Sequence, residues 1–242
     1  MKVKKPVTSQ TFRKEKGQRT NDIIRRFHNI HKELEKLKAN PNTFKQKQLE
    51  SELEAKGGIR AYQQASRMGA SRFNSEKWLI KNLLSDSKAV SLLDVGALSI
   101  NYALPQVQVT SIDLNPCIPQ IKKMDFLDVN ESYDVVCLSL VLNFTGCPET
   151  RAKMIQKCKS VVKKDGFVYI VLPLPCVMNS RHFSEDYFVN SLMKSVDFQF
   201  VKKHESKKLS FFIFQNSAYK FVDGLIGFSD RKRSNNFKIP VL

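Results

Sequence analysis

The feature that most constrains the fold is a change in texture after Ser87. Beyond this residue, short apolar runs alternate with polar or helical segments. The runs are mostly apolar without alternation, which is typical of strands buried on both faces of a parallel sheet. The strand candidates are Ser91–Val95, Val109–Asp113, Ile121–Met124, Asp134–Leu138, Phe167–Leu172, Phe198–His204 and Leu209–Phe214, with helices predicted over Glu149–Lys163 and Glu185–Val196. The pattern therefore predicts a mainly parallel α/β sheet.

The connections between these strands are unusual at both ends of the predicted sheet. About five polar residues around Ser206 join the last two strands, which predicts a hairpin and an antiparallel last strand. Only about 11 residues separate Gly96 from the second strand, and about seven separate Asp113 from the third. Parallel crossovers normally take roughly 10–12 residues or more. We therefore expect the first two crossover helices to be short or absent.

The rest of the chain divides by composition. Residues 1–20 are polar and basic and are predicted to be a disordered tail. Residues 21–86 form a helical N-terminal extension, residues 87–216 the α/β domain, and residues 217–242 a basic C-terminal tail. Within the extension, apolar spacing predicts helices over 22–37, 44–56, 59–70 and 75–84.

Charge is concentrated at the ends of the chain. The net charge is +17; residues 1–40 hold 12 lysines and arginines against four acids, whereas residues 91–216 hold 14 against 12. Basic ends on a nearly neutral domain are typical of binding to a polyanion such as nucleic acid, although solubility alone also accounts for them. No apolar run approaches the ~20 residues of a membrane span. This predicts no membrane association. The five cysteines lack any CxxC or metal-ligand spacing, so we expect reduced thiols and no metal.

Candidate binding residues follow the first three strands. Gly96 comes directly after the first strand, where a glycine lets a ligand approach the backbone. Asp113 ends the second strand, where a carboxylate can accept hydrogen bonds from both ribose hydroxyls of a nucleoside cofactor. Asp125 and Phe126 follow the third strand and could bind an adenine amino group and cover its ring. A helix cap followed by a core phenylalanine is the alternative interpretation of this pair.

The fourth strand runs into a segment with polar residues at the sheet edge. Ser139 and Asn143 lie where the reacting group of a cofactor would be. Asn143 is the candidate for holding a base edge, because its amide both donates and accepts. Phe144 could stack on the base, and Pro173 and Pro175 could shape the pocket rim. Each of these residues could equally serve the core or the loop geometry.

These segments resemble a known family. The succession LLDVGALS, SIDLNP, KKMDFLDV and YDVVCLSLVLNF resembles the cofactor loops of class I S-adenosylmethionine-dependent methyltransferases. SLVLNF together with Gly57-Gly58 and the segment YQQAS at 62–66 resembles, more narrowly, the fungal nucleolar 25S ribosomal RNA adenine-N1 methyltransferases. The resemblance covers roughly residues 55–216. The family also includes animal proteins similar to S-adenosylmethionine sensors of nutrient signalling.

The resemblance implies a class I methyltransferase (Rossmann-like) fold and S-adenosylmethionine as cofactor. The cofactor-binding residues that it implies are Asp94, Gly96, Asp113, Leu114, Asp125, Phe126 and Ser139, with Tyr62 and Gln63 as a wall supplied by the extension. A packing role for Tyr62 and Gln63 is equally compatible with the sequence. The glycine loop departs from the family pattern, because Ala97-Leu98-Ser99 replaces its second and third glycines.

The implied function is an enzyme that methylates N1 of an adenine in large-subunit ribosomal RNA. Asn143 and Phe144 are its catalytic candidates. No general base is needed to remove a proton, because N1 carries an in-plane lone pair. The implied partner is ribosomal RNA or the pre-ribosome, and the implied location is the nucleus and nucleolus. The alternative is an S-adenosylmethionine-binding sensor or scaffold that acts through protein interaction. Methylation of a protein or small molecule would leave the basic N-terminus unexplained.

Overall fold

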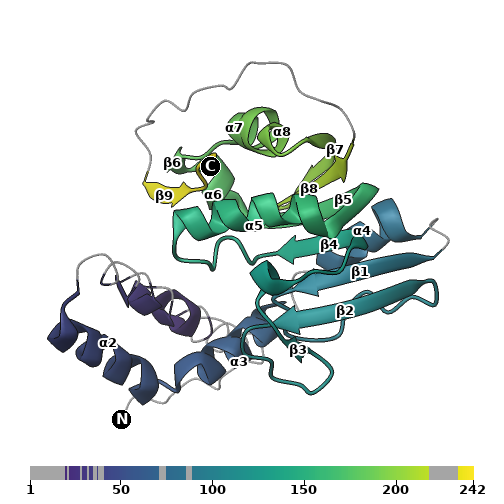
Figure 1. Ribbon diagram of the computed structural model, residues 1–242. Helices are drawn as coiled ribbons and strands as arrows, with labels where there is room; N and C mark the ends of the chain where they lie inside the picture. The colour runs from purple at the N-terminus through teal and green to yellow at the C-terminus, as the bar shows by residue number, and fades with distance from the viewer. Residues whose placement is uncertain are drawn as a thin grey trace, which may run out of the picture. The chain divides into compact units, whose positions relative to one another are not determined.

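The structure is a computed structural model that describes most of the chain in two compact units, residues 1–74 and 75–242 (Figure 1). The described residues are 20, 22–27, 29–31, 33, 34, 37, 41–70, 75–85, 89–217 and 234–242, with the side chains of 66–70 left out. The predicted tail over residues 1–20 lies outside the described residues except for its last position.

The first unit is helical. Its described residues between 20 and 37 are helical, as predicted, and are followed by α2 (Thr43–Ala55) and α3 (Gly58–Ala70). The side chain of Asn42 caps α2 by accepting a hydrogen bond from the Lys45 amide at 2.9 Å. No residue of α2 is buried, so the helix lies on the surface of its unit. The ring of Phe27 stacks on Tyr62 at 4.3 Å and joins the first helix to α3.

The second unit contains a seven-stranded sheet in the order β3-β2-β1-β4-β5-β8-β7 (Figure 1). The strands are β1 (Val90–Val95), β2 (Val107–Asp113), β3 (Lys122–Lys123), β4 (Tyr133–Ser139), β5 (Val162–Pro173), β7 (Phe198–Glu205) and β8 (Leu209–Asn216). Every pair from β3 to β5 is parallel, and β8 is antiparallel to both β5 and β7. The predicted parallel sheet with an antiparallel last strand is confirmed.

The first two crossovers contain no helix among the described residues, as their lengths predict. The connection from β1 to β2 is instead fixed by Tyr102, whose side chain is 3% exposed and whose φ is 61°. Its hydroxyl lies near the thiol of Cys137 on β4, and burial raises the pKa of both groups well above their usual range. The Val107 amide then donates to the Leu104 carbonyl at 3.0 Å and starts β2. A buried aromatic side chain thus replaces the helix that usually packs this connection.

Helices cover both faces of the sheet. One face carries the main apolar core, between the strands, α5 (Pro148–Val161) and the continuous helix formed by α7 (Glu185–Tyr187), η3 (Phe188–Leu192) and α8 (Met193–Ser195). The other face is covered by α4 (Ser75–Leu79) and the π-helix η1 (Ile80–Leu84), where Trp78 stacks on Tyr169 at 5.9 Å. Helix α5 ends at Val161, two residues before the predicted end, because β5 begins at Val162.

A second, two-stranded sheet pairs β6 (Ser180–His182) with β9 (Asn235–Lys238), and α6 (Leu174–Met178) precedes it. This sheet was not predicted: β9 lies within the segment assigned to a basic C-terminal tail. Phe237 and Ile239 are 6% and 1% exposed and belong to the main core. Burial of these two apolar side chains draws the described end of the chain, residues 234–242, into the folded unit.

Candidate functional site

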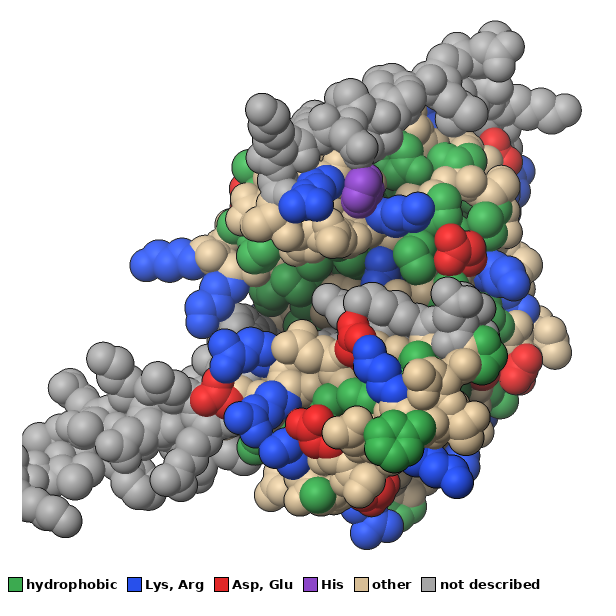
Figure 2. Space-filling model, turned by 90° about the vertical axis from the view of Figure 1, so that its left-hand side faces the viewer, with side chains coloured by type: hydrophobic (Ala, Val, Ile, Leu, Met, Phe, Trp, Pro, Cys, Tyr) green, Lys and Arg blue, Asp and Glu red, His purple; other side chains and the backbone are tan. Residues whose placement is uncertain are grey.

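The carboxyl edge of the parallel strands collects the predicted site residues of the second unit. Strand β1 lies between β2 and β4, and Val95 is in register with Ile112. The positions that follow, Gly96 and Asp113, are therefore neighbours at this edge, and Ser139 ends β4 beside them. In Figure 1 the strands β1, β2 and β4 point to the left, and Figure 2 looks onto that side of the molecule.

Gly96 makes the turn at the end of β1 in a conformation that favours glycine. Its φ is +70°, and its amide donates to the Ile112 carbonyl at 2.8 Å. A Cβ atom added here would lie 2.8 Å from Cγ2 of Val141. The requirement for glycine thus arises from backbone conformation and from contact with the segment after β4. This contact also couples the predicted cofactor loop to the loop that carries Asn143.

Asp94 is a buried carboxyl group beneath this turn. Its side chain is 4% exposed and accepts a hydrogen bond from Asn101 Nδ2 at 3.4 Å. Burial raises the pKa of Asp94 to about 7; the Asn101 hydrogen bond opposes this rise and the charge of Glu76 adds to it. A carboxyl group that exchanges its proton near neutral pH is typical of a functional site.

The other predicted cofactor residues are divided between the edge and the core. The half-buried Asp113 accepts a hydrogen bond from the Asn115 amide at 2.7 Å, and burial raises its pKa. Leu114 beside it is 57% exposed. Asp125 caps a short 3-10 helix, η2 (Phe126–Asp128), by accepting from the Leu127 amide at 2.9 Å, while Phe126 is 3% exposed and lies in the core. This pair thus forms the helix cap and core phenylalanine of the alternative interpretation, and its role toward an adenine stays a prediction.

The loop after β4 carries the predicted catalytic residues. Leu140 has a φ of 60°, a strained backbone conformation for a residue other than glycine. Its amide donates to the Val171 carbonyl at 3.0 Å. In the turn that follows, Oδ1 of Asn143 is buried and has no hydrogen-bond partner among the described residues. Phe144 closes the turn through its amide, which donates to Val141 at 2.9 Å. A buried acceptor without a partner costs about 1–3 kcal/mol, which a ligand can recover; Ser111 Oγ and Ser210 Oγ are also buried without a partner among the described residues.

Arg151 is a residue of this region that sequence reasoning missed. It lies on α5, its side chain is 4% exposed, and its guanidinium donates to the carbonyls of Thr145 and Gly146 at 2.7 and 3.1 Å. A third hydrogen bond, at 2.8 Å, reaches the carbonyl of Lys238 on β9. An arginine on the inward stripe of a predicted helix was the one available signal, since arginine is almost never fully buried without partners.

The remaining predicted residues belong to the helical unit or to the ends of β4 and β5. Tyr62 and Gln63 belong to the helical unit, where Gln63 is 5% exposed; their role as a cofactor wall stays a prediction. Ser139 Oγ donates to Ser75 Oγ at 3.3 Å. Pro173 ends β5 and Pro175 lies in α6, after the edge. Among the described residues there is no cluster of metal-ligating side chains and no helix long and apolar enough to span a membrane.

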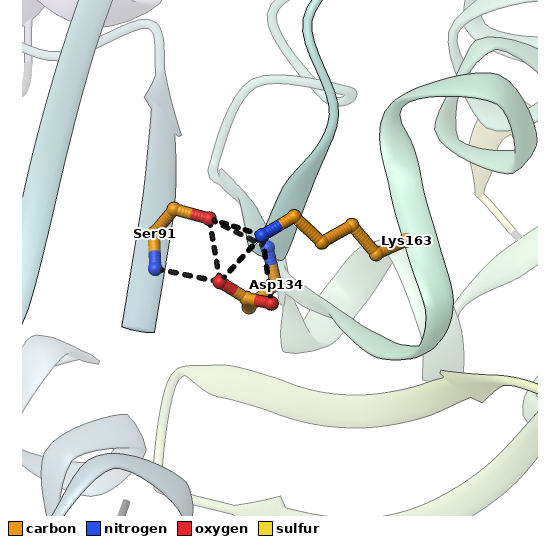
Figure 3. Close-up of polar contacts among 3 residues, drawn as sticks. All are labelled: Ser91, Asp134 and Lys163. Atoms are coloured by element: carbon orange, nitrogen blue, oxygen red, sulfur yellow. Dashed lines mark hydrogen bonds and ion pairs between the residues drawn. The ribbon is translucent and has the colours of Figure 1, made fainter. Parts of the chain in front are cut away.

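A second polar cluster lies at the opposite, amino edge of the sheet (Figure 3). Asp134, at the start of β4, accepts from the Ser91 amide at 2.8 Å, from Ser91 Oγ at 2.5 Å and from Lys163 Nζ at 3.0 Å. Burial tends to raise the pKa of Asp134, but the hydrogen bonds from Ser91 and the Lys163 charge outweigh it and hold the pKa below its usual range. Every group of this cluster has a partner.

The residues at the carboxyl edge fit the cofactor that the sequence implies. A half-buried carboxylate ends β2, a glycine turn ends β1, and an unpartnered buried amide oxygen follows β4. With the strand order and the antiparallel β8, this arrangement defines a class I S-adenosylmethionine-dependent methyltransferase.

The sequence matches, over residues 47–239, the family described as "25S rRNA (adenine(2142)-N(1))-methyltransferase, Bmt2". The chain belongs to this family.

Two curated relatives carry the same activity in their names. The 25S rRNA adenine-N(1) methyltransferase of Schizosaccharomyces pombe is 32% identical and is aligned over 99% of this chain and 98% of its own length. The 25S rRNA (adenine(2142)-N(1))-methyltransferase of Saccharomyces cerevisiae is 30% identical over 66% of this chain and 51% of its own length, so the match spans about half of that relative. A solved structure of magnesium protoporphyrin IX methyltransferase from Synechocystis is similar over 65% of this chain, with 14% identity and a TM-score of 0.48.

Proposed function

We propose that this protein transfers a methyl group from S-adenosylmethionine to N1 of an adenine in large-subunit ribosomal RNA, within the pre-ribosome and in the nucleolus. Membership of the 25S rRNA adenine-N1 methyltransferase family supports the reaction and its substrate. The single structural observation that carries the proposal is the buried, unpartnered Oδ1 of Asn143 at the carboxyl edge of the sheet.

Residues at the ends of β1 and β2 are suited to hold the cofactor. Asp113 would accept the ribose hydroxyls, while the turn at Gly96 leaves the backbone accessible to the methionine end. Asp94 lies beneath that turn and exchanges its proton near neutral pH. When bound, S-adenosylmethionine supplies a methyl group on a positively charged sulfur.

The loop after β4 would hold the acceptor base. Oδ1 of Asn143 can accept a hydrogen bond from the adenine 6-amino group, whose hydrogens lie next to N1 on the same edge. Phe144, one residue further along the same turn, would stack on the ring. The lone pair of N1 forms the new bond to carbon, the positive charge passes from sulfur to the base, and no proton is removed beforehand. Alignment and electrostatic complementarity would then supply the rate enhancement.

The charge of the chain fits a polyanionic substrate. Residues 1–56 carry 15 lysines and arginines against seven acids, and basic side chains recur over the face shown in Figure 2. Neutralised phosphates release counterions, so binding through this charge would weaken as salt concentration rises. An S-adenosylmethionine sensor would have no use for such a charge distribution.

The decisive test is methyl transfer to RNA. Purified protein is incubated with isotopically labelled S-adenosylmethionine and unmodified large-subunit ribosomal RNA, and the digested nucleosides are analysed by mass spectrometry. We expect labelled 1-methyladenosine among the nucleosides. Cofactor binding without transfer to RNA, measured under the same conditions by calorimetry, would refute the enzymatic proposal and favour a sensor. Loss of the same methyl group from cellular ribosomal RNA after deletion of the protein tests the substrate in vivo.

The role of the basic segment is tested separately. Deletion of residues 1–40 should weaken RNA affinity and flatten its dependence on salt, because each lost phosphate contact removes close to one unit of slope. Cofactor affinity should stay within about twofold. If the melting temperature and cofactor affinity fall together while the salt slope stays unchanged, the segment serves the fold instead.

A further inference from the structure

The loop that follows β4 is held at both ends by groups outside itself. At its start, Leu140 donates to Val171 on the neighbouring strand β5. At its end, the carbonyls of Thr145 and Gly146 both accept from the guanidinium of Arg151. Asn143 and Phe144 lie between these two attachments. Their position relative to the sheet edge therefore depends on where the Arg151 side chain is fixed.

Arg151 is fixed from the other side by β9. Its Nη1 donates to the Lys238 carbonyl, and the guanidinium lies 4.7 Å from the ring centre of Phe237. Arg151 forms no ion pair with a carboxylate of the described residues, so its donors are directed to three backbone carbonyls. Because the guanidinium is planar and rigid, three simultaneous hydrogen bonds determine its orientation and with it the end of the loop.

Strand β9 is held in place by side chains from elsewhere in the second unit. Three consecutive carbonyls of this segment accept from side chains of the folded unit: Phe237 from Ser180, Lys238 from Arg151, and Ile239 from Tyr187 at 2.9 Å. The Asn235 side chain donates to the Pro175 carbonyl at 3.2 Å, close to the end of β5. The described C-terminal segment therefore offers a fixed point beside the catalytic loop.

We propose that Arg151 is a positioning residue for the loop that presents Asn143 and Phe144, and that β9 is the fixed point through which it acts. The C-terminal strand is then a component of the active site, although it contacts neither cofactor nor base. This inference rests on the proposed function of the loop. It adds that loop geometry is set by a segment nearly 90 residues further along the chain.

The test compares Arg151→Lys with Tyr187→Phe. The first variant keeps a positive charge but cannot make all three hydrogen bonds. The second removes one hydrogen bond at Ile239, directly after β9, and leaves the loop contacts intact, so it loosens the fixed point without altering Arg151. We expect Arg151→Lys to lower kcat for RNA methylation about tenfold or more, with cofactor affinity within about twofold. Tyr187→Phe should give a smaller loss of the same kind, because Ser180 and Arg151 still hold the segment. Normal kcat in Arg151→Lys, or a greater loss in Tyr187→Phe than in Arg151→Lys, would overturn the proposal.

Amide hydrogen exchange of residues 140–147 gives a readout that needs neither RNA nor cofactor. Exchange should be faster in Arg151→Lys and less accelerated in Tyr187→Phe; equal exchange in Arg151→Lys and the wild type would overturn the proposal. If Arg151→Lys does not fold, Phe237→Leu replaces it, since it removes the ring that faces the guanidinium and should give a smaller effect of the same kind. Failure of the wild type to methylate RNA would refute the proposed function alone, because the exchange measurement still decides whether Arg151 orders the loop.

Discussion

At the amino edge of the sheet, Asp134 accepts hydrogen bonds from Ser91 and Lys163, and each partner is oriented by the others (Figure 3). At the carboxyl edge of the same strands, Asp94 has one long hydrogen bond, and Asn143 Oδ1 has none among the described residues. The pKa shifts follow this difference: the pKa of Asp134 is lowered, whereas that of Asp94 is raised to about 7.

The two edges of one sheet thus separate polar groups that stabilise the fold from polar groups that are available to a ligand. A satisfied polar cluster stabilises the fold, while incompletely satisfied buried groups cost free energy that a ligand can recover. Backbone conformation does not follow this division: Gly96 and Leu140 have positive φ directly after β1 and β4 at the carboxyl edge, and Asp165 has a φ of 62° in β5 near the amino edge. The two edges should therefore respond in opposite ways to matched substitutions.

The largest expected effect is on catalysis. Asn143→Ala should lower kcat for RNA methylation about 100-fold, because it removes a group placed at the reacting edge of the base. The same substitution should leave the melting temperature unchanged or slightly raised, because it removes a buried acceptor without a partner. Ser91→Ala at the amino edge should do the reverse: kcat stays within about twofold, and unfolding free energy falls by about 1 kcal/mol. Steady-state kinetics and urea unfolding of both variants measure these effects. Equal losses of activity in the two variants would contradict the prediction.

The next effect concerns cofactor affinity. Asp113→Ala should weaken S-adenosylmethionine binding about tenfold to hundredfold, because a carboxylate that accepts hydrogen bonds from hydroxyl groups contributes about 1.5–3 kcal/mol. Asp134→Ala is the matched control, since it removes a carboxylate from the other edge of the same sheet. Calorimetric titration of both folded variants should show normal affinity for Asp134→Ala only. Unchanged affinity in Asp113→Ala would refute the assignment of the ribose site.

Much of this arrangement could be predicted from the sequence, because its determinants are local. Buried strands reveal themselves as apolar runs, and the lengths of the first two crossovers predicted the absence of helices there. The positions of Gly96 and Asp113 at the carboxyl edge follow from the strand ends alone. These features depend on residues that are close together in the chain, so the sequence pattern is enough to predict them.

What could not be predicted depends on partners far apart in the chain. The sequence of β9, Asn-Asn-Phe-Lys, has no strand pattern. The carbonyls of β9 and of the next residue accept hydrogen bonds from side chains more than 50 residues away. Tyr102 fills the place of a crossover helix, and its hydroxyl lies near Cys137 on β4, 35 residues further along the chain. Asn143 and Phe144 could be proposed as candidates, but the missing partner of Oδ1 becomes visible only after the loop is folded.

A smaller effect is the pH dependence of stability from Asp94. Its pKa is about 7 in the folded state and about 3.9 when unfolded, so the folded protein holds a proton that the unfolded chain releases. Stability should therefore fall as pH rises from about 4 to 7. Asp94→Asn cannot ionise, and it should gain up to about 2 kcal/mol over the wild type at pH 8 while matching it near pH 4. Urea unfolding across this range checks the sign; a gain that is greatest at low pH would contradict it.

The smallest effect is the opposite pH dependence at the amino edge. Asp134 has a lowered pKa in the folded state, so its stabilisation is present above about pH 4 and is lost as pH falls through the folded value. Lys163→Met keeps the aliphatic stem and removes the charge. Because the Lys163 and Asp134 side chains are 45% and 38% exposed, we expect a loss of only about 0.5 kcal/mol at pH 7. The loss should shrink in high salt and as pH falls low enough to protonate Asp134 in the folded state. Unfolding at two salt concentrations and three pH values would detect it, and a loss that does not shrink as pH falls below about 4 would mean that Lys163 acts through its packing rather than its charge.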